Sequence, residues 1–244
     1  MDDYQWIEGI VAVEAILMAQ SRDVAEILIS QDRFDGRVAR LQQLAQALRV
    51  AVARVPDSVL NQRAGGDFQG GVIAKVGLRR MQTVDSLFES LRPVIFMLDG
   101  VEDPYNFGQA VRSIHAAGID GLIVPPRNWL SAAATVLRSS AGASEFMPTA
   151  VATAVDAASA ARLRNVPVAV ATAVDALPMH ELDLGGPLLL VIGGEKRGVA
   201  RAVEQAADLR VSIPYDREVQ YALGTAAAAA VLSFEILRQR RSRS

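Results

Sequence analysis

The sequence of 244 residues contains no cysteine and only two histidines, His115 and His180. The absence of cysteine excludes disulfides, thiolate nucleophiles and metal sites with sulfur ligands. Two isolated imidazoles give little support to zinc-finger or triad chemistry, and we expect His115 to be an ordinary helix residue and His180 a loop residue. The chain must therefore act through other side chains and its backbone, and we expect no metal.

Long apolar runs and an excess of one charge are also missing. No apolar run reaches the roughly 18 residues that span a bilayer, and the first residues, MDDYQWIEGI, lack the basic segment of a signal peptide. We therefore expect a cytoplasmic protein with no membrane partner. The formal net charge is only −2, so a nucleic-acid partner must be met by a local basic patch. We interpret the arginine-rich end, RQRRSRS, as solvated.

The sequence is instead rich in apolar residues, which make up 51% of the chain and suffice for a buried core. Alternating strand and helix patterns predict a compact α/β module over residues 1–80, followed by a linker over 81–92. From 93 to 244, unalternated apolar strands are separated by helices, which is typical of a parallel sheet covered on both faces. In this second domain we expect strands at 94–98, 121–125, 166–172, 187–193 and 209–214, and helices at 107–117, 131–139, 154–164, 201–207 and 225–237.

Three loops at predicted strand ends carry the candidate functional residues. The first, residues 99–118, places Asn106 where it is expected to cap the following helix. Arg112 is harder to explain as a structural residue. Its apolar neighbours suggest a largely buried helix, in which an arginine needs an anionic or carbonyl partner.

The second loop follows an apolar strand and contains Gly193, Gly194, Glu195 and Gly198. Glycines at the carboxyl end of a strand expose backbone amides to a ligand, although an ordinary glycine-rich turn with an exposed Glu195 gives the same pattern. Their spacing matches neither the dinucleotide nor the phosphate-loop fingerprint. In the third loop, Ile213 supplies an apolar wall just before the chain turns toward its alanine-rich last helix.

Four segments together carry a resemblance to a known family: DPYNFGQAVR (103–112), SSAGASEFMP (139–148), VIGGEKRGVA (191–200) and VSIPYDREV (211–219). Their order and approximate spacing resemble the SpoU (TrmH-like) family of RNA ribose 2′-O-methyltransferases, over residues 93 to about 238. Through WIEGIVAVEAIL and FQGGVIAKV, residues 1–80 are also similar to the small α/β RNA-binding domain that precedes the catalytic domain in rRNA-modifying members.

The resemblance implies a trefoil-knotted parallel-sheet methyltransferase domain of the SPOUT superfamily, preceded by the small RNA-binding domain. It implies a homodimer in which the partner's first loop completes each site. The implied reaction transfers a methyl group from S-adenosyl-L-methionine to a ribose 2′-hydroxyl of structured RNA, with 23S rRNA favoured over tRNA. The implied cofactor contacts are Thr172, Gly193, Gly194, Gly198, Ile213, Ala222 and Thr225, and the implied catalytic or substrate-orienting residues are Asn106, Arg112 and Glu195.

Two positions depart from the family pattern. The last loop of the family usually reads S-L-N-V-S, whereas residues 221–225 read YALGT, so Leu223 replaces an asparagine that could hydrogen-bond in the site. Arg217 stands where a small glycine is usual and could reach an RNA phosphate. A catalytically silent RNA-binding paralogue is therefore an alternative. A nucleotide-dependent oxidoreductase is disfavoured because no acidic ribose ligand follows a glycine fingerprint.

The chemistry of the implied residues limits their roles. A guanidinium is a poor base in proteins, so we expect Arg112 to act electrostatically, by holding a phosphate and stabilising the developing alkoxide. Glu195 would orient backbone amides or Arg112, and Asn106 would hold the loop.

Overall fold

The computed structural model describes residues 4–64, 70–126, 132–194, 198–219 and 221–243. The chain divides into two compact units. Unit 1 comprises residues 1–80 and 129–146, and unit 2 comprises residues 81–128 and 147–244. Residues 129–146 thus belong to unit 1, although they lie within the sequence range expected for the second domain.

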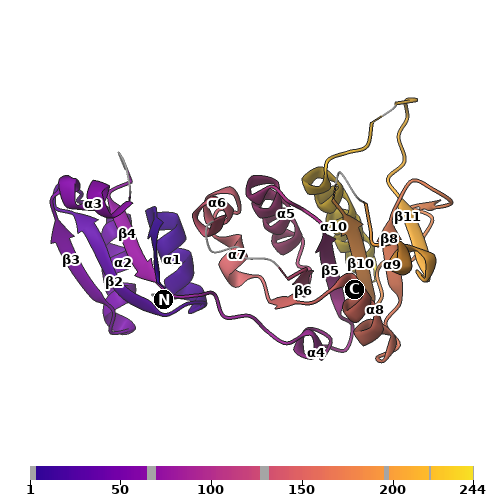
Figure 1. The fold of residues 1–244 in the computed structure, drawn as a ribbon, viewed down its shortest axis with the longest axis horizontal. Coiled ribbons are helices and arrows are strands. Elements are labelled where there is room, and N and C mark those ends of the chain that lie inside the picture. Colours follow the sequence, from indigo (N-terminus) through magenta and orange to yellow (C-terminus); the bar gives the residue numbers. More distant parts are fainter. Residues whose placement is uncertain (1–3, 65–69, 127–131, 195–197, 220, 244) are drawn as a thin grey trace. The chain divides into compact units, whose positions relative to one another are not determined.

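Unit 1 is built on a four-stranded mixed sheet in the order β1-β4-β2-β3 (Figure 1). Strands β2 and β3 are parallel, whereas β4 is antiparallel to both of its neighbours. The strands of unit 1 are β1 (Gln5–Glu8), β2 (Val24–Ser30), β3 (Ala51–Val55) and β4 (Val72–Val76). Its helices are α1 (Ile10–Ala19), α2 (Gly36–Ala47), α3 (Asp57–Ala64), α6 (Ala133–Ser139) and α7 (Ala143–Phe146).

The main core of unit 1 lies between this sheet and helices α1 and α2. Ile16 of α1, Ile27 of β2 and Leu41 of α2 are fully buried in one apolar cluster, which Leu137 of α6 also joins. Helix α2 begins at a cap, since the Asp35 carboxylate accepts hydrogen bonds from the first backbone N–H groups of the helix.

A buried ion pair holds α7 within unit 1. The Glu145 carboxylate accepts hydrogen bonds from Nε and Nη2 of Arg22, both at 3.0 Å, and from the hydroxyl of Ser21. Glu145 and Arg22 are both buried. Burial also lowers the pKa of the nearby Arg79 guanidinium, and the Glu145 charge opposes that shift.

Unit 2 contains a seven-stranded sheet in the order β7-β6-β5-β10-β8-β11-β9, and every neighbouring pair is parallel. The predicted α/β fold with a parallel sheet is confirmed. The strands are β5 (Val94–Asp99), β6 (Gly121–Val124), β7 (Thr149–Val151), β8 (Val168–Ala171), β9 (Leu177–Pro178), β10 (Leu188–Gly193) and β11 (Leu209–Ser212). The helices are α4 (Val84–Leu87), α5 (Pro104–Ala116), α8 (Ala154–Arg162), α9 (Arg201–Gln205) and α10 (Thr225–Arg241).

Helices cover both faces of the unit 2 sheet, which explains its unalternated strands. Ile95 and Met97 of β5 pack in a cluster with the alanines of α8. Phe96 and Leu98 point to the opposite face and are also buried, and on that side α10 packs against α5 and β10. The core therefore leaves the carboxyl edge of the sheet as the place where loops can form a site.

Helix α5 begins at Pro104, three residues before the predicted start. The Asp103 carboxylate accepts hydrogen bonds from the backbone N–H groups of Tyr105 and Asn106, and Pro104 occupies the first helical position. The prediction that Asn106 caps this helix is therefore wrong. Asn106 lies in the first turn, because an acidic residue three positions earlier supplies the cap.

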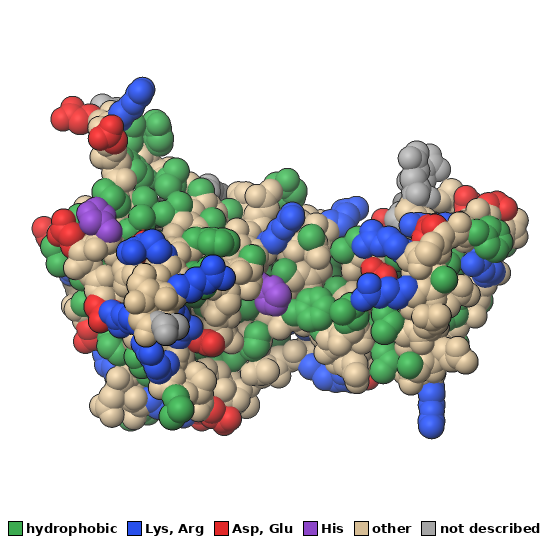
Figure 2. All heavy atoms as spheres, turned by 180° about the vertical axis from the view of Figure 1, so that it is seen from behind, with side chains coloured by type: hydrophobic (Ala, Val, Ile, Leu, Met, Phe, Trp, Pro, Cys, Tyr) green, Lys and Arg blue, Asp and Glu red, His purple; other side chains and the backbone are tan. Residues whose placement is uncertain are grey.

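Two arginines of the arginine-rich end of the chain, Arg240 and Arg243, are paired within unit 2 rather than simply solvated. Arg240 lies 3.3 Å from the Asp120 carboxylate, and Arg243 pairs with Asp183. On the face drawn in Figure 2, basic side chains are intermixed with acidic ones, in keeping with the small net charge. Within the ranges that the structure describes, no helix combines the length and apolarity needed to cross a membrane.

Candidate functional site

A cavity of about 940 Å³ opens at the carboxyl ends of β8, β10 and β11 and at the start of α10. The structure brings together there all seven residues that the family resemblance assigns to the cofactor. They are Thr172, Gly193, Gly194, Gly198, Ile213, Ala222 and Thr225. Two loops far apart in the sequence, after β10 and after β11, thus form one cavity.

The glycine wall of the cavity is a crossing of backbone segments. A Cβ on Gly194 would lie 2.1 Å from the carbonyl oxygen of Gly100, and one on Gly193 would lie 2.2 Å from the carbonyl carbon of Gly198. Gly198 has a φ of +64°, and a Cβ there would meet nothing within 4 Å. Gly193 and Gly194 are thus required by the close approach of the chain to itself, whereas Gly198 faces open space.

Asp99, at the end of β5, ties this glycine loop to the sheet. Its backbone carbonyl accepts a hydrogen bond from the N–H of Gly194 at 2.6 Å, and its carboxylate accepts one from the N–H of Ala200 at 3.0 Å. Gly194 and Ala200 are therefore both held to the end of β5, through the backbone and the side chain of Asp99.

The loop after β11 forms the opposite wall. The N–H of Leu223 donates a hydrogen bond to the Tyr215 hydroxyl at 2.9 Å, which closes the base of the loop, and Ile213 is half-buried beside it. Thr225, at the start of α10, donates from its hydroxyl to the carbonyl of Gly193 at 3.1 Å. Thr225 therefore joins the two loops.

The aromatic part of this wall is not among the residues expected from the sequence. Tyr215 and Tyr221 both line the cavity. The chain has only four tyrosines, so two of them in one short loop are the sequence signal for this wall. Thr172, directly after β8, also lines the cavity. It is half-buried, and its hydroxyl lies 3.4 Å from the Glu204 carboxylate.

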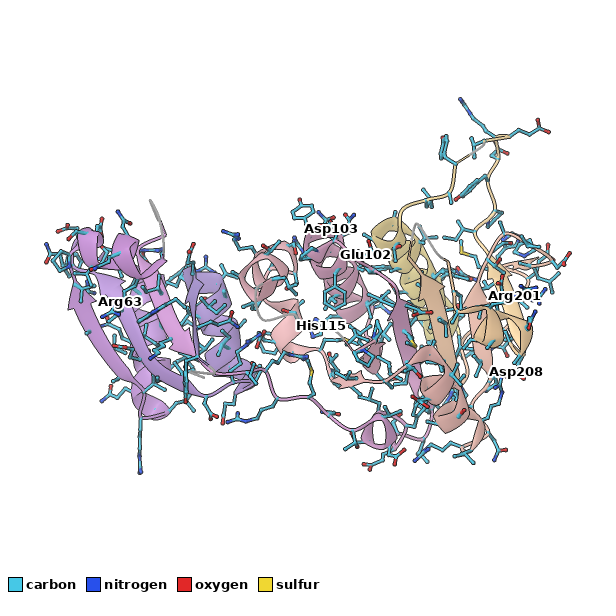
Figure 3. The ribbon with its side chains drawn as sticks, viewed as in Figure 1. Arg63, Glu102, Asp103, His115, Arg201 and Asp208 are labelled. Atoms are coloured by element: carbon cyan, nitrogen blue, oxygen red, sulfur yellow. The ribbon has the colours of Figure 1, made fainter. Side chains whose placement is uncertain are left out.

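The residues implied as catalytic are not gathered in the cavity. Asn106 is half-buried in the first turn of α5, on the same edge of the sheet, and Arg112 is exposed about 9 Å further along the helix axis. Neither lines the cavity. Glu195 lies outside the described residues. His115 is in the last turn of α5, at the end opposite the labelled Asp103 (Figure 3), and His180 is in an exposed turn.

The expectation that Arg112 is largely buried is wrong. The buried face of α5 is formed by residues at helical spacing, namely Phe107, Ala110, Val111 and Ile114. Arg112 follows Val111 by about 100° around the helix and so falls off this face. Its guanidinium therefore needs no partner inside the unit.

The cavity is apolar and backbone-lined rather than charged. Of the described residues in its lining, none carries an ionisable acid or base other than the two tyrosines. In the described part of the chain, no three metal-ligating side chains group together. This arrangement suits a ligand with a flat apolar portion and polar groups that can bind main-chain N–H and C=O groups.

Comparison with known proteins matches both halves of the chain. Residues 93–234 match the SpoU rRNA Methylase family, and residues 6–82 match the family described as RNA 2′-O ribose methyltransferase substrate binding. The chain is 33% identical to the 23S rRNA (guanosine-2′-O-)-methyltransferase RlmB of Pseudomonas aeruginosa, covering 98% of both chains.

Solved structures share the fold. One described as an RNA 2′-O ribose methyltransferase is 27% identical, with a TM-score of 0.77 over 98% of this chain and 90% of that one. The SpoU methyltransferase AviRb of Streptomyces viridochromogenes, in complex with AdoMet, is 23% identical, with a TM-score of 0.80 over 98% of this chain and 92% of its own.

Proposed function

Because the chain belongs to the SpoU rRNA methylase family, we propose that it transfers the methyl group of S-adenosylmethionine to the ribose 2′-hydroxyl of a guanosine in 23S rRNA. The observation that carries this proposal is the cavity at the carboxyl ends of β8, β10 and β11, because segments of two family motifs form its opposite walls. The full-length similarity to an enzyme named for this reaction supports the choice of 23S rRNA over tRNA.

The residues of the cavity fit S-adenosylmethionine. Its volume of about 940 Å³ lies at the upper end of the roughly 300–1,000 Å³ range of small-molecule sites. Ile213 and Ala222 would hold the adenine, and Thr172 would lie beside it. The backbone of Gly193, Gly194 and Gly198 would hold the polar groups, and Thr225 would fix the two loops together. When bound, the cofactor supplies a methyl group that the positive charge on sulfur already activates.

The side chains on α5 act on the RNA in this proposal. A guanidinium is a strong hydrogen-bond donor and a poor base, so Arg112 holds an RNA phosphate and stabilises the developing alkoxide instead of removing a proton. Asn106 holds the loop before α5, and Glu195 orients Arg112 or the neighbouring amides. Positioning supplies most of the rate enhancement, because the methyl donor needs no further activation.

We infer a homodimer, in which α5 of one copy completes the cavity of the other. Asn106 and Arg112 do not line the cavity of their own chain. Helices α5 and α10, which pack together, carry the exposed Tyr105 and Phe234, and these offer apolar surface to a second copy. Sedimentation should give a dimer, and a stable monomer at micromolar concentration contradicts this arrangement.

The finer architecture is also part of the proposal. Unit 2 would hold the trefoil knot of the superfamily, supported by the insertion of β10 between β5 and β8 and by the crossing of Gly194 against Gly100. Residues 1–80 would bind RNA, 81–92 would link, and 93–244 would carry catalysis in the cytoplasm. An experimental structure with bound RNA tests the knot and the division of labour together.

Calorimetry tests cofactor binding first. We expect a heat of binding for S-adenosylmethionine, and its absence at millimolar cofactor would overturn the methyltransferase assignment. Radiolabelled methyl transfer to 23S rRNA and tRNA transcripts then identifies the substrate, and nucleoside mass spectrometry of RNA from a deletion strain locates the modification. Binding of cofactor and RNA without any transfer would favour the silent paralogue.

A further inference from the structure

Unit 1 presents one aromatic side chain that its own core does not use. Phe34, between β2 and α2, is 77% exposed. The guanidinium of Arg54, on β3, lies over the ring, 4.3 Å from its centroid. An exposed ring backed by an arginine on one face leaves its other face open to a planar partner.

The backbone around Phe34 is held in place. Nη1 of Arg54 donates hydrogen bonds to the carbonyls of Ser30 and Arg33, at 3.2 and 2.9 Å. Asp35, directly after the ring, caps α2. The backbone is therefore held both before and after Phe34, which reduces the entropy lost when a ligand binds to the ring.

A cavity of about 600 Å³ lies beside Arg33, the residue directly before Phe34. It is lined by Arg33, by Arg138 of α6, by residues at the start of α1, and by the acidic residue Glu8. Arg33 is held by a hydrogen bond from Nε to the Asp35 carboxylate, at 2.8 Å, and by the carbonyl of Gly70. Arg138 is exposed. Two arginines that line one cavity suit a phosphate group, because guanidinium groups bind phosphate oxygens through several N–H donors.

We propose that unit 1 binds one nucleotide of a single-stranded part of the substrate RNA at this place. An unpaired base stacks on the open face of Phe34, and an adjoining phosphate lies between Arg33 and Arg138. The inference rests on the proposed function, from which it takes RNA as the substrate. Unpaired bases are the ones that stack on aromatic and arginine planes, whereas a duplex keeps its base faces covered.

The stacking half is tested by binding of a fluorescein-labelled 23S rRNA transcript to the full chain, measured by anisotropy. Phe34→Ala should weaken binding about 5- to 150-fold, whereas Phe34→Trp should stay within about twofold of wild type. Emission of the introduced indole should be quenched when RNA is added. Leu163→Ala, which removes an 84% exposed apolar side chain from unit 2, is the matched control and should change nothing.

The phosphate half is tested by the salt dependence of the same binding. Arg138→Gln should reduce the slope of log affinity against log salt by about 0.7 to 0.9, the value of one phosphate contact. Phe34→Ala should leave the slope unchanged. Arg49→Asn is the control. Arg49 is exposed just before β3 begins, whereas Arg54 lies near the end of that strand. Asparagine tolerates the φ of +58° at position 49.

Affinity for S-adenosylmethionine should be unchanged in every variant. The inference is overturned if Phe34→Ala binds RNA no more weakly than Leu163→Ala, or if Arg138→Gln changes the slope no more than Arg49→Asn. Wild type that methylates 23S rRNA, with both test variants behaving like their controls, would refute this inference alone. If Phe34→Ala and Arg138→Gln show the expected changes in RNA binding but wild type transfers no methyl group, the proposed function alone is refuted.

Discussion

Arg112 is exposed on a helix whose opposite face is buried, so its side chain is available to RNA without a role in folding. We expect Arg112→Lys to fold normally and to bind S-adenosylmethionine as wild type does. Methyl transfer should fall about 100-fold or more, since lysine keeps the charge but loses the planar fork that holds two oxygens. Single-turnover transfer and calorimetry measure the two quantities. Transfer within about twofold of wild type would contradict a catalytic role.

Leu223 is one of the two positions at which the sequence departs from the family pattern. It lines the cavity, is 36% exposed, and is held through its backbone N–H rather than its side chain. An amide at this position remains in contact with water, so Leu223→Asn avoids the ~1–3 kcal/mol cost of a buried unpartnered amide.

We therefore expect Leu223→Asn to fold, to bind cofactor and to transfer methyl at least as fast as wild type. Urea unfolding, calorimetry and single-turnover transfer separate these effects, and Asp216→Asn, at an exposed position of the same loop that does not line the cavity, is the control. Slower transfer by a folded, cofactor-binding variant would contradict this prediction and show that an amide at position 223 does not assist methyl transfer in this protein. An inactive wild type restored by this change would support the silent paralogue.

The sequence could predict which residues meet in the cavity but not why each is there. Strand ends in a parallel sheet share one edge, so Gly193 and Ile213 had to lie near each other once their strands were recognised. The contact of Gly194 with Gly100 depends on a crossing between distant segments, which no local pattern encodes. The exposure of Arg112 follows from its angle around the helix, which its apolar neighbours in the sequence do not show.

Among the elements, α10 is fixed by one buried amide near its end. The oxygen of Gln239 accepts a hydrogen bond from the N–H of Leu184, and its nitrogen donates to the carbonyls of Met179 and Leu182. Gln239→Leu should destabilise the protein by about 1–3 kcal/mol, because these backbone groups lose their partner. Urea unfolding measures the change. Arg241→Gln, at the exposed end of the helix, should have little effect, and equal effects would contradict the anchor.

The same turn of α10 gives the protein a pH dependence. A hydrogen bond from Arg238, followed by one from Gln239, lowers the pKa of the Glu235 carboxyl below its ordinary value of 4.5. A lowered folded-state pKa adds stability above the unfolded pKa, and this stability is lost as the pH falls through the folded value. Unfolding free energy measured between neutral and acidic pH should thus decline less steeply for Glu235→Gln. Equal slopes would show that the carboxyl contributes nothing.

Long apolar strands and amphipathic helices were predictable, whereas short elements were not. Strands β5 and β10 are unalternated because both faces of the sheet are covered, and that pattern is visible in the sequence. Strand β9 has two residues, so it carries no period. Helix α10 runs four residues beyond its predicted end, because tertiary contacts of its arginines and Gln239 extend it.

At the scale of the whole molecule, the chain passes between the two units three times, after residues 80, 128 and 146. Such a path cannot be predicted from composition, because residues 129–146 belong to unit 1 through contacts more than 100 residues away in sequence. The buried pair of Glu145 and Arg22 is the most specific of these contacts.

That pair allows a prediction in which a double change costs less stability than a single one. Glu145→Gln removes the charge that partners Arg22 while keeping the shape, so it should destabilise the protein by about 3–5 kcal/mol. The double variant Arg22→Met, Glu145→Leu removes both charges, and a buried ion pair replaced by apolar side chains of similar volume often costs nothing. Urea unfolding should therefore show the double variant to be more stable than the single one.

Hydrogen exchange provides the structural measurement. In Glu145→Gln, amides of α6 and α7 should exchange faster, since the pair that holds the segment to unit 1 is broken. In the double variant their protection should return toward the wild-type level. Exchange that stays slow in the single variant would show that the apolar contacts of Ala133 and Leu137 are sufficient to hold the segment. If the double variant were the less stable of the two, hydrogen bonding by Arg22 to Gly77, rather than the ion pair, would dominate at this place.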